Sequence, residues 1–134
     1  MRESEAASKA FPANSGFLAV AAGAFGAHGL ENMLETAPDG ARRLEVFRTG
    51  AHYHLVHAVA LLALATLHRH GRALIVARWS FVLGVLVFSG SLYLVGLTGI
   101  RWLGAITPVG GVGLLIGWAA VLMLRTDEVA QARN

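Results

Sequence analysis

Residues 79–99 read WSFVLGVLVFSGSLYLVGLTG, an uncharged run of 21 residues that decides the fold class. A helix rises about 1.5 Å per residue, so this run is about 30 Å long, which is the thickness of the hydrocarbon core of a bilayer. Three further runs, at 11–30, 49–67 and 102–124, also lack a formal charge. We therefore predict an all-α integral membrane protein with four transmembrane helices in an antiparallel bundle, built from residues 11–125.

The composition of the whole chain supports a membrane location. Of the 134 residues, 55% are hydrophobic and only 14% are charged, whereas an average soluble domain is about 45–50% apolar and about 25% charged. A chain of this kind is neither disordered nor an ordinary soluble domain. The net charge is +3, but no basic stripe with interleaved aromatic residues exists, so nucleic-acid binding is not expected. The absence of cysteine excludes disulfides, thiolate metal sites and thiol nucleophiles.

The polar segments define the tails and loops around the four runs. Residues 1–10 form a polar N-terminal tail and residues 126–134 a polar C-terminal tail. The Pro-Asp-Gly sequence at 38–40 marks a turn, after which a helix is expected to start near Ala41. A signal peptide is the alternative for 11–30, but the preceding tail carries as much acid as base and the run is rich in glycine.

The distribution of basic residues predicts the orientation. The two tails and the second loop lie on one side of the membrane and carry seven Lys and Arg residues, whereas the first and third loops carry four. Because cytoplasmic segments hold the excess of positive charge, both termini are predicted to be cytoplasmic.

Two of the four predicted helices carry stripes of small residues at three- and four-residue spacing. The stripes consist of Gly16, Ala19, Gly23 and Ala27 in the first run and of Gly110, Gly113 and Gly117 in the fourth. In lipid, where packing rather than hydrophobic burial drives association, small residues let helix backbones approach closely. We predict that the first and fourth helices use these stripes for close contacts. The alternative is that the glycines reflect the general tolerance of membrane helices for this residue.

The Thr107-Pro108 pair has two interpretations. Pro108 lacks an N–H and crowds the carbonyl four residues back, so it could kink a continuous fourth helix. Alternatively, Thr107 could cap a helix that starts with Pro108 at its first position. The second interpretation places non-helical backbone around residues 102–107 at membrane depth.

The polar residues of the spans gather in the half that faces away from the cytoplasm. They are His28, His52, His54, His57, Ser89, Ser91, Tyr93, Thr98 and Thr107. An ionisable residue inside a membrane is a functional hypothesis by default, because it costs energy unless it is paired. We predict a polar pocket made of His28, His54, His57, Ser89, Ser91, Tyr93 and Thr107. Within it, His57 is expected to be a neutral hydrogen-bonding residue near Ser89, Ser91 or Tyr93.

Metal binding and catalysis are the alternatives to a structural role for the histidines. Imidazole is the commonest metal ligand, so His28, His54 and His57 could supply three nitrogens, and His28 with His57 could form a haem pair. However, no carboxylate lies within the spans, so we expect neither a metal nor another cofactor. Ser89 and Ser91 likewise lack a buried Asp or Glu to complete a catalytic relay with histidine. We therefore expect no enzymatic activity.

Several motifs, in order along the chain, resemble a known family. They are GAFGAHGL at 23–30, FSGSLYL at 88–94, LTG at 97–99, ITPVGG at 106–111 and Gly117-Trp118. This pattern resembles the YgdD family, a domain of unknown function (number 423) that is related to eukaryotic transmembrane protein 256. The resemblance covers residues 11–124. It implies a small four-helix membrane protein, placed in the plasma membrane in bacteria, for which no activity is established.

One position departs from the family pattern. Members often have Tyr-Gln where this chain has Tyr53-His54, followed by His-Ala, which is His57-Ala58 here. The resemblance therefore favours His28 and His57 over His54 as residues with a shared role.

Together, these features predict a structural or accessory component of the membrane. Its surroundings are the lipid bilayer, and its partner is a second copy or a larger membrane protein. The alternative is a small proton or solute conduit, or a sensor, that uses the polar pocket and assembles as an oligomer. A conduit needs polar groups through the whole membrane thickness, whereas this sequence is polar in one half, which favours the accessory role. A lipid- or quinone-modifying enzyme would need catalytic carboxylates, which the spans lack.

Overall fold

The computed structural model describes residues 2–67 and 71–132, with side chains described for residues 12–67 and 71–124. This part of the chain is helical and contains no strand, which confirms the all-α prediction. The elements in chain order are α1 (Arg2–Phe25), the π-helical turn η1 (Gly26–Leu30), α2 (Glu31–Leu34), α3 (Gly40–Ala65), α4 (Arg72–Thr98), the 3-10 helix η2 (Arg101–Ile106) and α5 (Thr107–Ala132).

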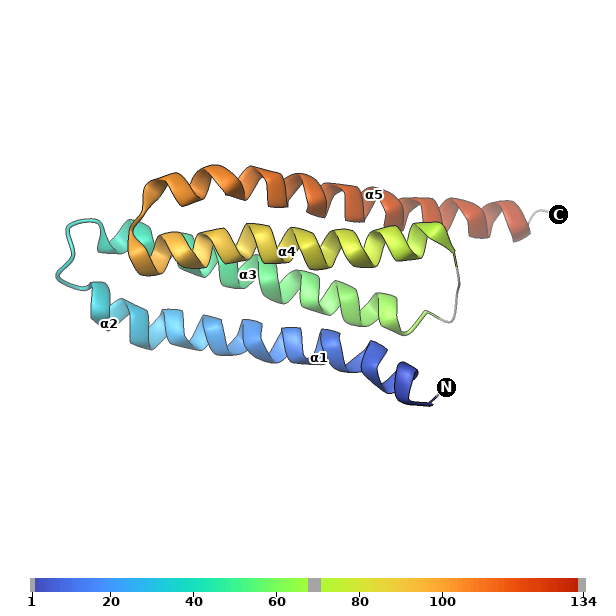
Figure 1. Ribbon diagram of the computed structural model, residues 1–134, viewed down its shortest axis with the longest axis horizontal. Helices are drawn as coiled ribbons and strands as arrows, with labels where there is room; N and C mark the ends of the chain where they lie inside the picture. Colours follow the sequence, from blue (N-terminus) through green and yellow to red (C-terminus); the bar gives the residue numbers. More distant parts are fainter. Residues whose placement is uncertain (1, 68–70, 133–134) are drawn as a thin grey trace.

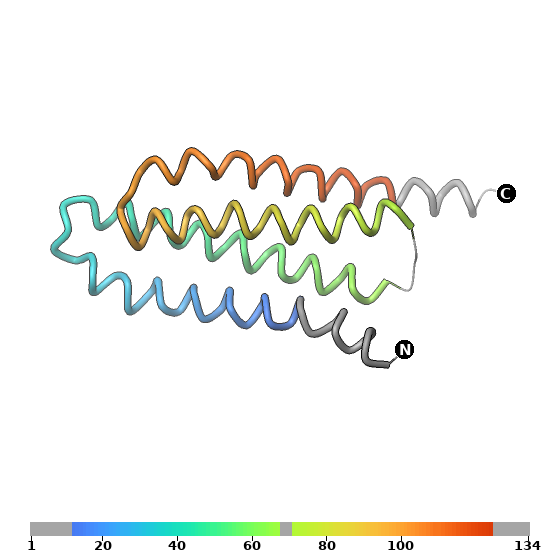
Figure 2. The backbone as a smooth tube through the Cα atoms, viewed as in Figure 1, coloured from blue at the N-terminus to red at the C-terminus, as the bar shows by residue number. Residues whose placement is uncertain are grey.

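The four long helices lie side by side in chain order (Figure 1). α3 packs against α1, α4 packs against α3, and α5 packs against α4, each antiparallel to the one before it. The tube in Figure 2 follows the same order from blue through green and yellow to orange. The start of α1, the end of α3, the start of α4 and the end of α5 share one end of the molecule, and α2 and η2 lie at the other.

The helices extend beyond the uncharged runs that predicted them. α1 begins at Arg2, within the predicted N-terminal tail, and α5 runs to Ala132, within the predicted C-terminal tail. α3 begins at Gly40, the last residue of the turn motif at 38–40, next to the expected start at Ala41. An uncharged run reports the hydrocarbon core, whereas polar residues with good helix propensity continue a helix beyond it. The helices therefore continue past the predicted spans at both ends of the chain.

The end of α4 is determined by a glycine. Gly99 has φ 73°, and its N–H donates to the carbonyl of Val95 at 2.8 Å. This left-handed conformation closes a helix and is free of steric cost only without a Cβ atom.

The start of α5 matches neither interpretation of Thr107-Pro108. The α-helix begins at Thr107, after the 3-10 turn η2, so no kinked continuous α-helix is present. Thr107 itself has helical dihedral angles, with φ −52°, so it is not the N-cap that the second interpretation required. Pro108 lies in the first turn of α5, where its missing N–H interrupts no helical hydrogen bond.

The apolar core is divided into two clusters. The larger one joins α3, α4 and α5 and contains Leu61, Leu64, Leu74, Ala77, Phe81, Val85, Leu114 and Ala120. The smaller one joins η1, α2 and α3 and contains Leu30, Leu34, Leu44 and Phe47. Along α3, His54 and His57 lie between the two clusters, so the polar residues form a layer between two apolar regions.

The glycines of α5 pack closely against α4. A Cβ atom added to Gly110 would lie 2.3 Å from the backbone nitrogen of Phe88, and one added to Gly117 would lie 2.4 Å from the Phe81 ring. At Gly113 the corresponding distance to Cα of Gly84 is 3.2 Å. We call this contact, between Gly110, Gly113 and Gly117 and the facing side of α4, the glycine seam.

Of the predicted stripe on α1, only Ala19 lies on the buried face of the helix. A Cβ atom added to Gly16 or Gly23 would meet nothing within 4 Å, so the prediction of close packing at these residues is wrong. Ala27, the last member of that stripe, is only partly buried. α1 instead buries a face made of Pro12, Ser15, Ala19, Gly26 and Leu30. This face lies about one residue, or about 100°, around the helix from Gly16, Gly23 and Ala27.

Candidate histidine site

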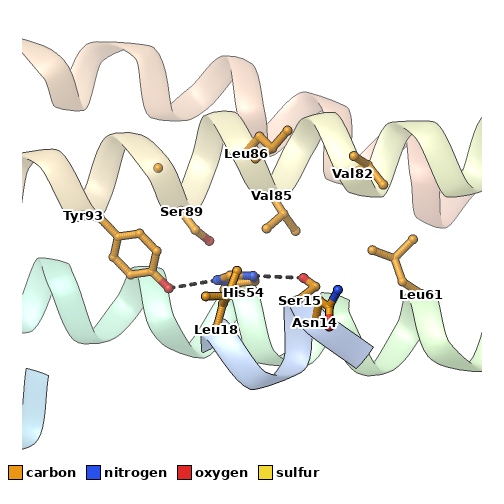
Figure 3. A pocket seen from close by; sticks show the side chains of 11 residues that line it. Asn14, Ser15, Leu18, His54, Leu61, Val82, Val85, Leu86, Ser89 and Tyr93 are labelled. Carbon is orange, nitrogen blue, oxygen red and sulfur yellow. Dashed lines mark hydrogen bonds between the residues drawn. The ribbon is translucent and has the colours of Figure 1, made fainter. Parts of the chain in front are cut away.

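His54 is bonded to hydroxyl groups of two other helices (Figure 3). Its Nε2 atom lies 3.0 Å from Oγ of Ser15 on α1, and its Nδ1 atom lies 3.1 Å from Oη of Tyr93 on α4. One ring nitrogen of a neutral imidazole donates and the other accepts, and a hydroxyl can do either, so both bonds form in either tautomer. His54 therefore joins α1, α3 and α4 through one side chain.

His57 is buried in an aromatic cage, with only 4% of its surface exposed. Its Nδ1 atom is 2.8 Å from the carbonyl oxygen of Tyr53, and its Nε2 atom accepts from the indole N–H of Trp118 at 3.2 Å. A carbonyl only accepts and an indole only donates, so the neutral tautomer with its proton on Nδ1 satisfies both bonds. The ring of Phe81 packs edge-on against the imidazole at 5.3 Å between centroids.

The partners of His57 differ from those expected. Its hydrogen bonds go to its own helix and to Trp118 on α5, and not to Ser89, Ser91 or Tyr93 on α4. The expectation of a hydrogen-bonding histidine inside the bundle fits the observed geometry, but the predicted partners of His57 were wrong. The available signal was the Gly117-Trp118 motif, because an indole N–H deep in a membrane needs an acceptor.

Ser91 and Thr107 form a separate bond between α4 and the start of α5. Their hydroxyl oxygens are 2.7 Å apart, and the Ser91 hydroxyl also donates to the carbonyl of Phe88 at 2.8 Å. Since a serine hydroxyl has one hydrogen, the Thr107 hydroxyl is the donor to Ser91. This bond fixes the first turn of α5 on α4.

His28 lies apart from the other histidines. It is exposed on η1, and the neighbouring Gly26 packs beside Phe47 of α3. His57 follows Phe47 by ten residues, which corresponds to about 15 Å along a helix. Imidazole nitrogens bind a metal ion at about 2 Å, so this spacing is too large for His28 and His57 to share one ion or one haem. Within the residues that the structure describes, no group of three His, Cys, Asp or Glu side chains could hold a metal ion.

The predicted pocket is thus divided into three bonded groups, the exposed His28 and the unpaired Ser89. Ser89 is 1% exposed, and its hydroxyl has no hydrogen-bond partner among the described residues. It lines a cleft of about 240 Å³ between α1, α3 and α4, together with Ser15, His54 and Tyr93 (Figure 3). Sequence reasoning missed Ser15, which is buried on α1 four residues before the buried Ala19.

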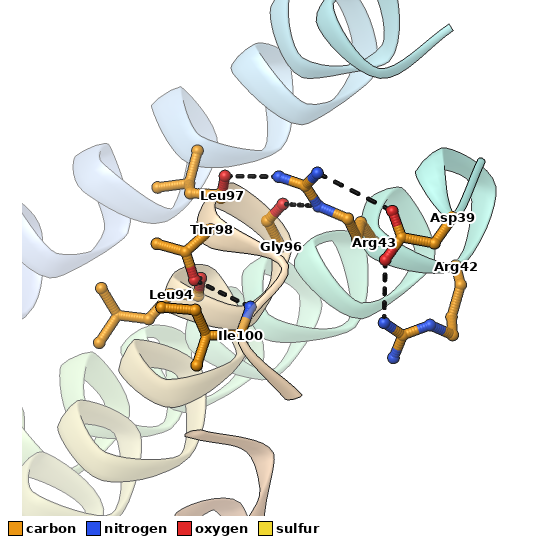
Figure 4. A network of polar contacts seen from close by, with 8 residues as sticks. All are labelled: Asp39, Arg42, Arg43, Leu94, Gly96, Leu97, Thr98 and Ile100. Carbon is orange, nitrogen blue, oxygen red and sulfur yellow. Dashed lines mark hydrogen bonds and ion pairs between the residues drawn. The ribbon is translucent and has the colours of Figure 1, made fainter. Parts of the chain in front are cut away.

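At each end of the α3–α4 pair, an arginine side chain of one helix bonds to the last carbonyls of the other. At one end, Arg43 of α3 donates from Nε to the carbonyl of Gly96 at 3.0 Å and from Nη2 to that of Leu97 (Figure 4). At the other end, Arg78 of α4 donates to the carbonyl of Leu64 at 2.7 Å. The last carbonyls of a helix lack hydrogen-bond donors within it and lie at the negative end of its dipole. A cationic donor at this position therefore supplies the hydrogen bonds and balances the negative charge. We call these two contacts the arginine anchors.

Within the described chain, two helices are long and apolar enough to cross a membrane. They are Arg72–Thr98 and Arg101–Leu124. α3 is less apolar because His52, His54 and His57, together with the basic residues of its first turns, lie on the same helix. The histidine layer is therefore the reason why α3 resembles a membrane span less than α4 does.

The described part of the chain is an all-helical bundle of four long helices, two of which are apolar enough to cross a membrane. A family model described as "Protein of unknown function (DUF423)" matches residues 22–111. The chain belongs to this family, which confirms the resemblance that its motifs indicated. No solved structure matches the chain.

Similar proteins are named as membrane proteins. UPF0382 membrane protein YwdK of Bacillus subtilis is 43% identical over 109 residues, which cover 79% of this chain and 85% of that protein. UPF0382 inner membrane protein YgdD of Escherichia coli K12 is 43% identical over 116 residues, which cover 84% of each. Neither name states an activity.

Proposed function

We propose that this chain is a non-enzymatic accessory protein of the plasma membrane, with four spans and both termini in the cytoplasm. The observation that carries the proposal is that the half-buried His54 and the buried His57 are used for bonds between helices. His54 links α1, α3 and α4, and His57 links α3 to α5. Neither histidine is bonded to a carboxylate of the kind that orients the histidine base in a catalytic relay, which favours a structural role for these bonds.

The length of the α3–α4 pair supports four spans. α3 runs antiparallel alongside α4, and the arginine anchors contact α3 at Arg43 and Leu64. Those residues are 21 positions apart, or about 31 Å in a helix. This length matches the hydrocarbon core of a bilayer, which is about 30 Å thick. Since α4 is apolar enough to span, a helix packed along its whole length lies at the same depth, and α1 packs on α3 in turn.

The charges support cytoplasmic termini. Both termini lie at the end that carries the larger number of basic residues. At the opposite end, three arginines are already bonded within the fold: Arg42 pairs with Asp39 at 3.3 Å, Arg48 pairs with Glu31 at 3.0 Å, and Arg43 anchors α4. The positive-inside rule counts Lys and Arg residues regardless of such pairing, so the seven-to-four difference carries the argument. The name of the Escherichia coli relative, an inner membrane protein, supports the plasma membrane as the location.

The topology is tested by labelling single cysteines in intact cells. Cysteine placed at Asp39 and cysteine placed at Gly71 are expected to react from opposite sides of the membrane, with Gly71 on the cytoplasmic side. Reaction of both positions from the same side would contradict the four-span arrangement.

A proton conduit is the second candidate, because Ser15, His54 and Tyr93 form a continuous series of exchangeable hydrogens. The two functions are separated by reconstituting the full chain in vesicles that contain a pH-sensitive dye. The accessory role predicts proton flux equal to that of protein-free vesicles, and identification of a second membrane protein or a second copy after purification in mild detergent. Flux that is lost in His54→Gln would contradict the proposal and establish the conduit.

A further inference from the structure

We propose that the cleft between α1, α3 and α4 binds one hydrocarbon chain that carries an uncharged hydrogen-bonding group, and that the Ser89 hydroxyl holds this group. The ligand class is a neutral lipid with a hydroxyl or carbonyl, such as a long-chain alcohol. This inference assigns a ligand and so goes beyond the accessory role.

The size and walls of the cleft fit a segment of a single hydrocarbon chain. Its volume is about 240 Å³, whereas an apolar cavity of about 150 Å³ is enough to take up benzene. Leu61, Val82 and Val85 form apolar walls between the helices. The cleft is too small for a helix of a second copy, because a helix with its side chains is about 10–12 Å across.

The unpaired hydroxyl of Ser89 is the observation that points to a polar group on the ligand. Its hydroxyl is buried and unpaired among the described residues, and its side chain is directed into the cleft (Figure 3). Other helical hydroxyls bond back to carbonyls three or four residues earlier, as Ser91, Thr49 and Thr98 do. A hydroxyl without a partner is costly where water is absent, so a ligand group that bonds to Ser89 would be favoured.

The lack of charged side chains in the cleft favours an uncharged headgroup. Of the residues that line the cleft, none is Asp, Glu, Lys or Arg. A charged headgroup would therefore meet no opposite charge, and an ion in such a site is expensive. Leu18 and Leu86, both more than half exposed, stand at the edge of the cleft and make an apolar entrance from the hydrocarbon core.

The test uses photoreactive probes on the full-length protein in mild detergent. One probe is a hexadecanol with a diazirine in its chain, and the other is the corresponding alkane without the hydroxyl. We expect the alcohol to label residues of the cleft, as mapped by mass spectrometry, and unlabelled hexadecanol to compete.

Two variants and one control separate what the volume of the cleft and the Ser89 hydroxyl each contribute to binding of the probe. Gly90 lines the cleft, and a Cβ atom there would meet nothing within 4 Å, so Gly90→Leu can fill the space without a clash. This variant should reduce labelling at least tenfold. Ser89→Ala removes no bond of the fold, and it should weaken the alcohol by about three- to tenfold while leaving the alkane unchanged. Gly23→Leu, at an equally open position outside the cleft, should label as the parent chain does.

Three results would overturn the proposal. One is labelling spread over the lipid-facing surface with no preference for the cleft. Another is equal loss of the alcohol and the alkane in Ser89→Ala, because the hydroxyl would then have no specific role. The last is probe-independent cross-linking between two copies through the cleft, which would show that a second chain covers it.

Discussion

The two outer helices of the molecule are held in opposite ways. α5 lies on α4 along the glycine seam, where Gly110 and Gly117 leave no room for a Cβ atom. α1 lies beside a cleft and reaches α4 through the Ser15–His54–Tyr93 series, while its own Gly16 and Gly23 face open space. The comparison teaches that a stripe of small residues permits close packing but does not by itself determine which face of a helix is packed.

The largest effect is expected where the glycine seam is broken. Gly110→Leu puts a side chain where the backbone of Phe88 lies 2.3 Å from the new Cβ position, so α4 and α5 must separate. Overpacking of this kind costs about 1–3 kcal/mol or more. The thermal midpoint in detergent should fall by several degrees, and an unchanged midpoint would show that the seam is not a packed contact.

A smaller effect is expected from removal of one bond beside the seam. Trp118→Phe keeps an aromatic ring but leaves Nε2 of His57 without its donor. Hydrogen bonds between membrane helices are worth about 0.6–1.7 kcal/mol, and the midpoint should fall accordingly. Trp79→Phe, at an exposed tryptophan, is the matched control. Equal midpoints for the two variants would contradict a structural role for the His57 bond.

The hydrogen bond between Ser15 of α1 and His54 should make a small but measurable contribution to stability. Ser15→Ala removes the bond between α1 and His54 and leaves the rest of the series in place. We expect a loss of about 0.6 kcal/mol and faster cleavage by a protease in the connection between α2 and α3. Cleavage at the rate of the parent chain would indicate that α1 is held by its apolar contacts alone.

The smallest effect is expected at the open glycine of α1. Gly16→Leu adds a side chain that meets nothing within 4 Å, so stability should change by no more than about 0.5 kcal/mol. Compared with Gly110→Leu, it makes the same chemical change on the opposite side of the molecule. If it were as destabilising as Gly110→Leu, α1 would have to pack against another surface, such as a second copy.

The sequence predicts the helical class and the α5 stripe, but it does not predict partners across the fold. Uncharged runs report membrane depth, and the spacing of Gly110, Gly113 and Gly117 reports one face of a helix, because both are local properties. The Trp118–His57 bond joins residues 61 positions apart, and it depends on how each helix is rotated about its axis. The rotation of α1 about its axis likewise differs from the predicted one by about one residue, so that Ser15 is buried where Gly16 was expected.

The family resemblance was equally uninformative about partners. It favoured His28 and His57, and His57 is indeed buried and bonded, whereas His28 is exposed on η1. His54, which departs from the family pattern, makes bonds to two other helices. A glutamine at this position could also donate and accept, so the departure preserves the hydrogen-bonding capacity.

The arginine anchors have a consequence for the surrounding lipid. Each holds the C-terminal carbonyls of the opposite helix, so α3 and α4 cannot slide past one another, even by about 1.5 Å, without stretching bonds at both ends. The hairpin therefore has a fixed apolar length and cannot relieve hydrophobic mismatch internally. In a bilayer thicker or thinner than about 30 Å, the adjustment falls to the tilt of the whole protein and to the lipids around it. Membranes of different thickness should then hold this protein at different tilt angles with the same helix register.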